Sequence, residues 1–321
     1  MLTETLAQYS IADFGAEVRF GLAQRGQKEL PSKYLYDDVG SRLFDVIAAL
    51  PEYGLTRAEE RILRRHAPEL AAHLDRPLIV AELGSGNGAK TRRILEALGG
   101  APSAYYPIEI SPSALAMCAR ELGDMESISI VGLERDYLDG LAEAASYRRP
   151  GERLLVLFLG STIGNFESSA AIQFLRQMRE ILQFGDALLL GTDMEKAVPV
   201  ILDAYDDALG VTAAFNLNLL ARINRELTGD FSLNRFEHVA LFNEQTRSIE
   251  MHIRSKCAQE ATIAKAGLIV RFEPDETIWT ESSHKYSMDE IVGFAADSGF
   301  RCDATWTDPE WAFADSLWTA C

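Results

Sequence analysis

A glycine-rich turn near the end of the first quarter of the chain limits its fold more than any other feature. An apolar run, Leu78-Ile79-Val80, is typical of a buried strand, and it leads into Gly84, Gly86 and Gly88. The segment Thr91–Leu98 then carries apolar side chains at helical spacing. A strand that enters a helix through closely spaced glycines is typical of the first unit of a Rossmann-like α/β sheet.

The residues around this turn are suited to a ligand. Glycines let the backbone turn sharply and approach a bound molecule without a Cβ in the way. The acidic Glu82 before the first glycine is uncommon in dinucleotide fingerprints and resembles the first motif of methyltransferases that use S-adenosylmethionine (SAM). Because strands also enter helices through glycine where no ligand binds, the turn alone leaves both interpretations open.

Two later features favour the ligand. Glu109 lies 25 positions after Gly84, near the end of the apolar run Tyr105–Ile110. That spacing is close to the value of about 20 for a carboxylate that accepts from ribose hydroxyls. A third apolar run precedes Asp136-Tyr137, a polar and aromatic pair suited to an adenine. The alternative for Glu109 is a solvated charge at a strand end.

Composition indicates an ordinary globular protein of one large domain or two. The chain has 321 residues, 47% of them hydrophobic and 25% charged, with a net charge of −17. Such a charge is repelled by phosphate backbones and anionic membranes, which argues against a nucleic-acid partner. We expect a small-molecule substrate and a monomer.

Targeting and metal signals are missing from the sequence. No apolar run is long enough to span a bilayer, and Met1–Ser10 has no basic segment of a signal peptide. The four cysteines are scattered without CxxC spacing, and the five histidines show no zinc-binding spacing. We therefore expect a cytoplasmic protein with neither a disulfide framework nor a metal site.

Further strand and helix units continue the α/β pattern. Strands are predicted at Tyr105–Ile110, Ile128–Leu133, Leu154–Leu159 and Ala187–Leu190, the last two almost wholly apolar as in central parallel strands. Ligands of such sheets bind beyond the carboxyl ends of the strands. The loop Gly160–Asn165 should therefore face the site, although Asn165 could instead cap the next helix.

The pattern changes after residue 193. Tyr205-Asp206-Asp207 and Thr212–Leu227 are predicted to be helical. Phe236–Phe242 and Ser248–Arg254 then read as antiparallel strands, and Ile263–Phe272 as a third. We interpret residues 194–286 as an α+β lobe.

The α/β pattern resumes near residue 287. Ser287 and Glu290 form a capping-box pattern, and Gly299 is placed to end the helix. Phe300–Trp306 and Trp311–Trp318 are predicted to close the sheet as a hairpin, with the last strand reversed as in methyltransferase sheets.

These residues together resemble the histidine Nα-methyltransferases of ergothioneine biosynthesis over nearly the whole chain. The resemblance rests on separated motifs: Tyr36-Asp37, Leu50–Tyr53, Glu82–Gly86, Phe158–Asn165, Ala204–Asp207, Gly210–Asn216, Ile249–Met251 and Thr280–Ser283. It implies an enzyme that methylates the α-amine of L-histidine with SAM, giving trimethylhistidine (hercynine). It also implies a Rossmann-like sheet (residues 57–193 and 287–321) that binds SAM, and a smaller α+β substrate lobe (residues 1–56 and 194–286).

The resemblance also assigns roles to individual residues. Glu281 and Ser283 would hold the imidazole, with Tyr53 and Met251 near it; Asn165 and Tyr205 would hold the amino-acid head group; and Tyr36 would lie near the reacting amine as the catalytic residue. The SAM site would comprise Tyr36, Gly84, Ser85, Gly86, Lys90, Glu109, Asp136, Tyr137 and Gly160. Relatives often have Asp in place of Glu109 and Phe in place of Tyr137, and both changes keep an acceptor and an aromatic ring.

Methyl transfer from a sulfonium needs alignment and a free lone pair, so positioning dominates and no metal or triad is required.

From composition alone, Tyr36 and Tyr53 could simply pack the first segment, and Glu281 could be a surface carboxylate. Three rival functions remain: a methyltransferase for another aromatic amino acid such as tryptophan, a non-catalytic SAM-binding protein, and an NAD-dependent oxidoreductase. A buried carboxylate at Glu281 would argue against an indole.

Overall fold

The computed structural model describes residues 11–321, which form two compact units. We call Leu55–Glu195 with His284–Cys321 the sheet unit, and the described residues up to Gly54 with Lys196–Ser283 the lobe unit. The domain limits expected from the sequence differ from these bounds by two or three residues. The binding roles given to the two parts remain predictions.

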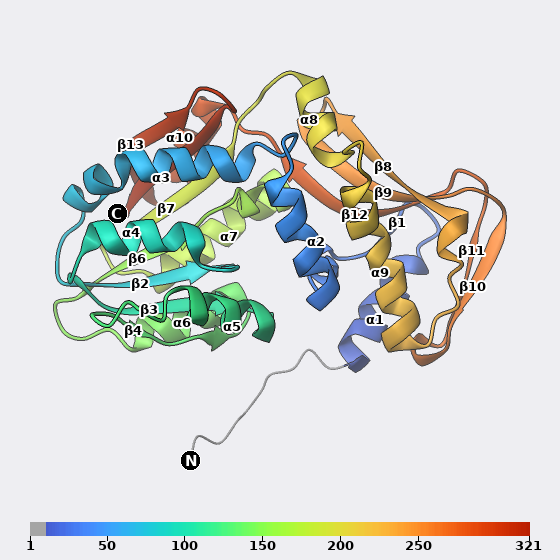
Figure 1. The fold of residues 1–321 in the computed structure, drawn as a ribbon, viewed down its shortest axis with the longest axis horizontal. Coiled ribbons are helices and arrows are strands. Elements are labelled where there is room, and N and C mark those ends of the chain that lie inside the picture. Colours follow the sequence, from blue (N-terminus) through green and yellow to red (C-terminus); the bar gives the residue numbers. More distant parts are fainter. Residues whose placement is uncertain (1–10) are drawn as a thin grey trace, which may run out of the picture. The chain divides into compact units, whose positions relative to one another are not determined.

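A single mixed sheet organises the sheet unit (Figure 1). Its strands within the described residues are β2 (Leu78–Leu83), β3 (Pro102–Glu109), β4 (Ser129–Ile130), β5 (Leu133–Glu134), β6 (Arg153–Phe158), β7 (Ala187–Asp193), β13 (Phe300–Asp308) and β14 (Phe313–Ala320). They lie in the order β13-β14-β7-β6-β2-β3-β4, and β5 also pairs with β3. The pairs β2–β3, β2–β6 and β6–β7 are parallel, whereas β14 is antiparallel to both neighbours. The predicted α/β class and the reversed closing hairpin are confirmed.

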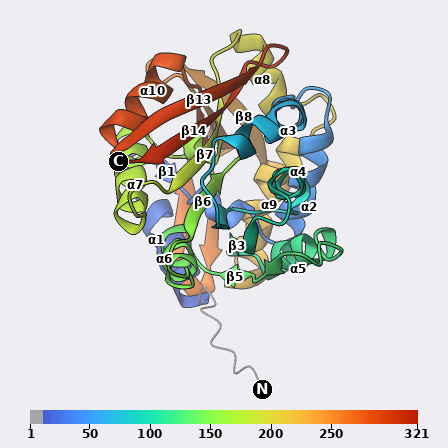
Figure 2. The same ribbon diagram turned by 90° about the vertical axis from the view of Figure 1, so that its left-hand side faces the viewer.

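Helices cover both faces of this sheet, as Figure 2 shows. They are α3 (Leu55–Ala72), α4 (Ala89–Leu98), α5 (Pro112–Glu121), α6 (Tyr137–Ser146), α7 (Ser168–Ile181) and α10 (Met288–Asp297), with the short 3₁₀ helix η2 (Thr162–Asn165). Helices α6, α7 and α10 pack on one face, and α3, α4 and α5 lie on the other. Alternate residues of the central strands, such as Ile79, Ala81 and Leu83, belong to the apolar core under α6, α7 and α10.

The start of α10 follows the predicted capping box. The Ser287 side chain accepts from the Glu290 backbone N–H, and the Glu290 carboxylate accepts from the Ser287 backbone N–H. Gly299 follows the helix with a φ of +84°, a conformation that favours glycine. The predicted capping box and the predicted terminal glycine are therefore confirmed.

The strand predicted at Ile128–Leu133 is not continuous in the structure. Residues 128–133 form two short strands, β4 and β5, that pair with different parts of β3. Val131 and Gly132 between them are exposed. Because this segment lies at the edge of the sheet, only short stretches of it pair with the neighbouring strand.

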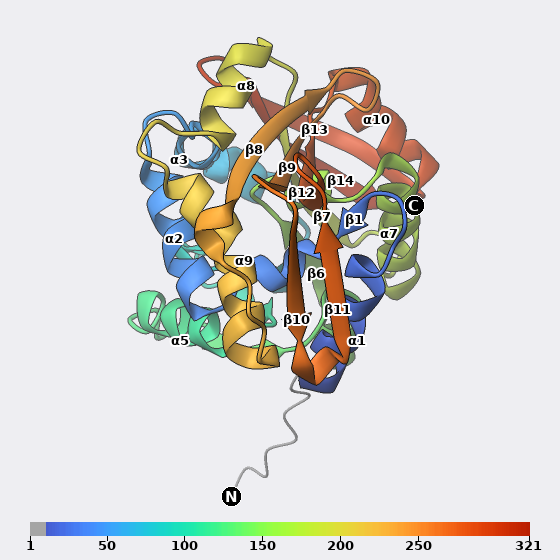
Figure 3. The ribbon, with the colours of Figure 1, turned by 90° about the vertical axis from the view of Figure 1, so that its right-hand side faces the viewer.

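The lobe unit contains a second sheet, of order β1-β12-β9-β8, and a separate hairpin, β10–β11 (Figure 3). The strands are β1 (Lys28–Glu29), β8 (Phe236–Asn243), β9 (Ser248–Ser255), β10 (Gln259–Ile263), β11 (Leu268–Phe272) and β12 (Thr277–His284). The helices are α1 (Ile11–Leu22), α2 (Asp38–Ala49), α8 (Val198–Tyr205) and α9 (Val211–Leu227), with the 3₁₀ turns η1 (Ser32–Leu35), η3 (Leu233–Arg235) and η4 (Ala264–Ala266). Helix α9 packs against β8 and β9 and against α2.

Two predictions for the lobe were wrong. The expected single strand Ile263–Phe272 is the turn and second strand of the β10–β11 hairpin, because the chain reverses through η4 and Gly267, whose φ is +58°. Asp206 and Asp207 are not helical. The Asp207 carboxylate instead accepts from the backbone N–H groups of Val211 and Thr212, at 3.0 and 2.7 Å, and so caps the start of α9.

No helix in the described part of the chain combines the length and the apolar character needed to cross a bilayer. The prediction that Met1–Ser10 lacks the basic segment of a signal peptide concerns residues outside the described part of the chain.

A carboxylate lies inside the sheet unit on its first parallel strand. Glu82 is 2% exposed, and its Oε2 accepts from the hydroxyls of Thr91 and Tyr105. Burial raises the pKa of Glu82 to about 7, although both hydrogen bonds act in the opposite direction. The Glu82 carboxylate therefore serves the packing of β2, β3 and α4.

Glu82 predicts a pH-dependent stability difference. An acid with a raised pKa in the folded state stabilises the fold fully below its unfolded pKa and loses that contribution as pH rises through its folded pKa, here about 7. Glu82→Gln keeps an acceptor and cannot ionise, so it should gain about 3 kcal/mol relative to the parent between pH 4 and 8. Denaturant unfolding of both proteins across this range measures the difference. A difference that stays constant with pH would contradict an ionisable Glu82.

Candidate functional site

The register of the parallel strands collects the predicted cofactor residues at one edge of the sheet unit. Leu83 lies opposite Ile108, and Glu109 lies opposite Glu134. The β6 strand ends at Phe158, opposite Leu190. The loops after β2, β3, β5 and β6 therefore all leave from the same carboxyl edge, where ligands of such sheets bind.

The glycine turn after β2 has the backbone that the sequence predicts for a ligand cradle. Gly84, Gly86 and Gly88 have φ values of +71°, +52° and +77°. The Gly84 N–H donates to the Ile108 carbonyl at 2.9 Å, which fixes the start of the turn. No atom lies within 4 Å of the position that a Gly86 Cβ would take, so the turn leaves open space there.

Glu109 is held at the end of β3 with its carboxylate directed at backbone N–H groups. Its Oε1 accepts from Ile110 at 2.9 Å and from Ser111 at 3.4 Å. Burial raises the pKa of Glu109, while hydrogen bonds from the backbone of Ile110, Ser111 and Gly86 act to lower it. The carboxylate thus reaches back to the glycine turn, which fits the role of a ribose acceptor.

Ser85 lies inside the turn. Its side chain is buried, and its carbonyl accepts from the Gly88 N–H at 3.1 Å. A Cβ on Gly88 would lie 2.8 Å from the Cys118 Sγ, so α5 packs directly on this part of the turn. Burial raises the pKa of Cys118 to about 11.

Asp136 and Tyr137 begin helix α6 at the same edge. Asp136 is exposed at the N-cap position. The Tyr137 ring lies edge-on to Phe158 and Phe174, and its hydroxyl lies 3.2 Å from the position that a Gly84 Cβ would take. Any larger residue at Gly84 would therefore meet Tyr137 as well as the strain of a positive φ.

Sequence reasoning missed Glu59, which links two predicted cofactor residues. Its side chain is fully buried; one carboxylate oxygen accepts from the Gly160 N–H at 2.7 Å, and the other forms an ion pair with the Lys90 ammonium. Burial acts to lower the pKa of Lys90, but the Glu59 carboxylate outweighs it and the net shift is upward. Glu59 occupies the apolar stripe of α3 with Leu55, Ala58, Ile62 and Leu63, and a charge on such a stripe was the available signal.

A further buried acid lies near this pair. Asp315 on β14 pairs with Gly191 on β7, and Glu59 Oε1 lies 2.4 Å from the position that a Gly191 Cβ would take. Burial raises the pKa of Asp315 well above its usual range, and the neighbouring Glu59 carboxylate adds to the shift. Only glycine at position 191 leaves room for Glu59.

Asn165 closes η2 in the loop after β6 and is half-buried. This loop begins with Gly160 and Ser161, both at positive φ. The buried Ser161 hydroxyl accepts from the Asp193 N–H at 2.8 Å, which ties the loop to the end of β7. The loop is therefore fixed at both Gly160 and Ser161.

The lobe unit brings the predicted catalytic residue Tyr36 and the predicted substrate residues Tyr53 and Tyr205 into one aromatic cluster. Tyr36 follows η1, Tyr53 follows α2, and Tyr205 ends α8. The Tyr36 ring lies 5.5 Å from both Phe44 and Phe215; Phe44 lies 6.1 Å from Tyr53, and Tyr53 lies 6.0 Å from Tyr205. Phe44 and Phe215 received no role from the sequence, although Phe215 belongs to a motif of the resemblance.

The predicted ring-binding residues lie on β12 and β9 beside this cluster. The Tyr36 hydroxyl donates to the Glu281 carboxylate at 3.4 Å, and Glu281 and Ser283 are both buried. Because alternate residues of a strand point the same way, these two side chains share a face of β12. Met251 is buried on β9.

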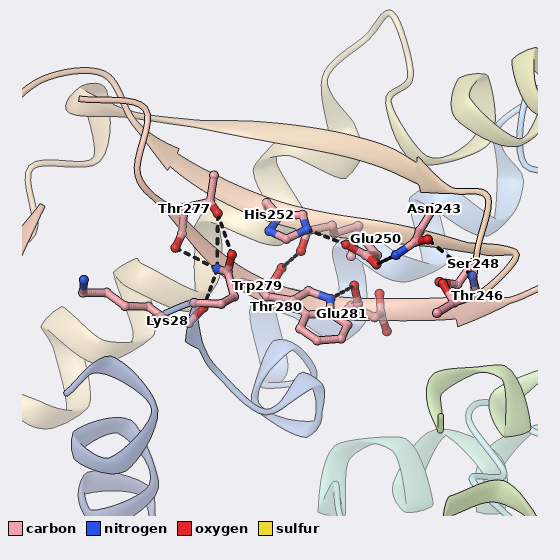
Figure 4. A network of polar contacts seen from close by, with 12 residues as sticks. Lys28, Asn243, Thr246, Ser248, Glu250, His252, Thr277, Trp279, Thr280 and Glu281 are labelled. Carbon is pink, nitrogen blue, oxygen red and sulfur yellow. Dashed lines mark hydrogen bonds and ion pairs between the residues drawn. The ribbon is translucent and has the colours of Figure 1, made fainter. Parts of the chain in front are cut away.

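Figure 4 shows the polar contacts that surround β12. The Trp279 Nε1 donates to the Glu281 carbonyl at 2.9 Å. His252 stacks on Trp279 with ring centroids 6.3 Å apart, and its Nε2 lies 3.0 Å from the Glu250 carboxylate. The Trp279 side chain thus holds the Glu281 carbonyl and is itself stacked on His252.

The predicted residues thus divide between the units. Gly84, Ser85, Gly86, Lys90, Glu109, Asp136, Tyr137, Gly160 and Asn165 belong to the sheet unit, whereas Tyr36, Tyr53, Tyr205, Met251, Glu281 and Ser283 belong to the lobe unit. Tyr36 was also expected to touch the cofactor, and that contact remains a prediction. In residues 11–321, no three His, Cys, Asp or Glu side chains are grouped in a way that could hold a metal ion.

The sheet unit also has a cavity of about 490 Å³ away from these residues. It is lined by Leu78 and Arg153, which begin β2 and β6, and by Thr319 near the end of β14. It therefore lies at the amino edge of the parallel strands, opposite the edge that binds ligands in such sheets.

Comparisons with known proteins agree with this geometry. Residues 14–320 match the model of a family described as histidine-specific, SAM-dependent methyltransferases. A histidine N-alpha-methyltransferase of Mycolicibacterium smegmatis is 42% identical over 98% of this chain and 99% of its own length. One from Mycobacterium tuberculosis is 41% identical, over 92% of this chain and 91% of its own.

A more distant relative bears on the rival substrate. An L-tryptophan methyltransferase of Psilocybe serbica is 28% identical over 88% of this chain and 86% of its own length. The two histidine enzymes are thus clearly more similar to this chain. With a family model that spans almost every described residue, the chain belongs to the histidine-specific, SAM-dependent methyltransferases.

Proposed function

We propose that this protein transfers methyl groups from SAM to the α-amine of L-histidine and carries the amine to the trimethylated product, hercynine. The observation that carries the proposal is the buried Glu281 carboxylate beside Tyr36, in contact with a cluster of aromatic rings. Family membership and the similarity to two histidine N-alpha-methyltransferases support it.

The lobe residues suit an imidazole better than an indole. Glu281 can accept from a ring N–H, and the Ser283 hydroxyl two positions on can donate to or accept from the other ring nitrogen. Tyr53 and Met251 supply apolar contact for the ring. An indole has a single N–H and a larger apolar surface, so it would leave the second polar group of the site unpaired.

The residues at the carboxyl edge of the sheet unit fit SAM. The open space beside Gly86 allows close approach, Glu109 supplies an acceptor for the ribose, and Asp136 with Tyr137 would hold the adenine. Lys90 and Gly160 would complete this site, and both are held by Glu59. When bound, SAM supplies a methyl group activated on a sulfonium sulfur.

The remaining task of the protein is to orient a neutral amine. Tyr205 and Asn165 would hold the amino-acid head group, and Tyr36 would lie near the nitrogen that reacts. The Tyr36 hydroxyl donates to Glu281, so its lone pairs stay available to accept from an amine N–H. Holding the lone pair in line is the main contribution expected of these residues.

We also propose that the sheet unit binds SAM, that the lobe unit makes most of the contacts with histidine, and that the protein is a monomer. The net charge of −17 argues against binding of nucleic acid.

Glu281 tests the substrate assignment. Glu281→Ala should retain SAM affinity and lose about 2–4 kcal/mol of transition-state stabilisation for histidine, from a lost charge-assisted hydrogen bond and a misplaced amine. The variant should also discriminate less against tryptophan, because no desolvated carboxylate opposes an apolar ring. The measurement is kcat/KM for both amino acids, followed by mass spectrometry.

Glu237→Gln is the matched control, since Glu237 lies on β8 and pairs with Arg254. It should leave kcat/KM for histidine unchanged. Unchanged histidine turnover in Glu281→Ala would remove the main chemical support for histidine.

Tyr36 and pH test the amine. Only the unprotonated amine can attack, so activity should rise from pH 6 into the alkaline range. Tyr36→Phe keeps the ring contacts with Phe44 and Phe215 and removes the hydroxyl, so kcat should fall by about tenfold or more while SAM affinity stays within about twofold. A flat pH profile, or a kcat equal to that of the parent, would show that amine deprotonation and Tyr36 do not limit the rate.

Glu59 tests the cofactor site. Glu59→Gln keeps an acceptor for the Gly160 N–H and removes the charge beside Lys90, so the Kd for SAM should rise by about tenfold, as for a lost hydrogen bond to a charged group. Glu152→Gln is the control, because Glu152 is also buried and accepts from Ser103 and the Arg149 N–H. Calorimetry should show a changed SAM affinity only for Glu59→Gln; equal effects would mean that Glu59 serves stability alone.

A further inference from the structure

A buried polar chain in the lobe unit joins two predicted substrate residues. Asn216 on α9 is fully buried, and its Oδ1 accepts from the Thr280 hydroxyl at 2.7 Å. Its Nδ2 lies 2.9 Å from the His238 Nδ1, and the His238 Nε2 lies 2.8 Å from the Tyr205 carbonyl. Thr280 directly precedes Glu281 on β12, as Figure 4 shows, so the chain runs from the neighbour of Glu281 to Tyr205.

The hydrogen bonds fix which atoms donate. A carbonyl can only accept, so the His238 Nε2 must carry a proton. Asn216 Nδ2 has two protons, which go to the His238 Nδ1 and to the His252 carbonyl at 3.1 Å. His238 Nδ1 must then be an unprotonated acceptor, and the ring is neutral.

Burial supports this assignment for His238. It lowers the pKa of the imidazole, although the Tyr205 carbonyl and the Asp206 and Asp207 carboxylates act to raise it. Reversing the Asn216 amide would place its oxygen against the lone pair of His238 Nδ1 and against the His252 carbonyl. His238 and the His252 carbonyl therefore fix the orientation of the Asn216 amide. The single proton of the Thr280 hydroxyl lies between two acceptors, the Asn216 Oδ1 at 2.7 Å and the Met251 carbonyl at 2.9 Å, so the same hydroxyl also ties β12 to β9.

The buried polar chain leads into the aromatic cluster from two sides. Tyr205 carries one end and contacts Tyr53 through its ring. Phe215, the neighbour of Asn216 on α9, contacts Tyr36 and Phe44. A change at Asn216 would thus alter α9, the Tyr205 backbone and β12 together.

We propose that Asn216 and His238 are positioning residues of the substrate site, which fix Tyr205 relative to Glu281 through the chain Thr280–Asn216–His238. The proposal rests on the proposed function, because it assumes that Tyr205 and Glu281 bind one substrate. Neither Asn216 nor His238 contacts histidine in this view; both act through the residues that they hold.

Two variants interrupt the chain at different points. Asn216→Asp has nearly the same shape but no N–H donors for His238 and the His252 carbonyl. Thr280→Val removes the hydroxyl with little change of volume, and Thr280→Ser restores it. Asn224→Asp is the control, because Asn224 lies on the same helix and bonds to the Phe231 backbone at 2.9 Å, apart from the chain.

The expected result is a change in substrate recognition that stability does not explain. Asn216→Asp and Thr280→Val should raise the KM for histidine by about tenfold or more, the size expected for loss of a buried hydrogen bond, and leave the Kd for SAM within about twofold. Thr280→Ser should return the KM to within about threefold of the parent, since the hydroxyl is restored. Asn224→Asp should lower Tm and leave the KM unchanged.

The ring of His238 gives a readout that does not depend on activity. Nitrogen NMR at pH 8 should show a neutral ring protonated at Nε2, assigned by its loss in His238→Gln. A ring protonated at Nδ1 would overturn the proposed chain.

The remaining outcomes separate the two proposals. If the parent does not methylate histidine, the proposed function fails. If the parent does, and Asn216→Asp and Thr280→Val keep its KM, or Thr280→Ser resembles Thr280→Val, the positioning role is overturned. It is also overturned if Asn224→Asp raises the KM equally, or if Asn216→Asp and Thr280→Val both fail to fold, because the chain would then be a determinant of stability.

Discussion

The parallel register of β2 with β3 and β6 is the constraint on which the cofactor edge depends. Leu83 lies opposite Ile108, and Glu82 lies opposite Leu157, so three strands end at nearly the same level. A shift of one residue in any of these pairs would turn its side chains to the other face. Glu82 would then leave the hydroxyls of Thr91 and Tyr105, and a buried carboxylate without partners is strongly unfavourable. The buried acid thus helps to specify the register as well as the packing.

The sheet unit concentrates buried acidic groups around the Lys90 ammonium. Glu59, Glu82 and Asp315 are all buried and lie close enough to Lys90 to influence its pKa. Burial raises the pKa of both Glu82 and Asp315, so neutral carboxyl groups relieve much of the repulsion. Glu59 alone has its two oxygens matched by an ammonium and a backbone N–H. The paired carboxylate is the one that touches the predicted cofactor residues.

The sequence predicted most of the fold because its strands carry strong local signals. Apolar runs and glycine punctuation located β2, β6 and β7, and the Ser287 capping box located α10. Local patterns gave the wrong secondary structure at two places. A turn at Gly267 lies inside an apolar stretch, and the Asp207 carboxylate caps the start of α9 where a helix was predicted.

The site was predictable only in part. Motif residues such as Tyr36 and Glu281 were named from the resemblance, and the lobe unit places their side chains in contact. Glu59 and His238 were not named, and Asn216 was part of a motif but received no role, because a buried ion pair or amide link depends on which elements meet in space. The spacing of residues along the chain does not show which helices and strands contact one another. Only the position of Glu59 on an apolar helix stripe marked it in advance.

The place of β14 in the sheet has a consequence for how this protein is made. β14 lies between β7 and β13, and it is synthesised after every other strand of the sheet. Until residues 313–320 emerge from the ribosome, the edge of β7 that faces away from β6 has no strand to pair with. All the residues of β7 are buried in the finished fold, and most of them are apolar. An unpaired, apolar strand edge is a template for association with other chains. The nascent protein therefore carries an unpaired strand edge from the synthesis of β7 until residues 313–320 emerge, and pairing by β14 ends that exposure.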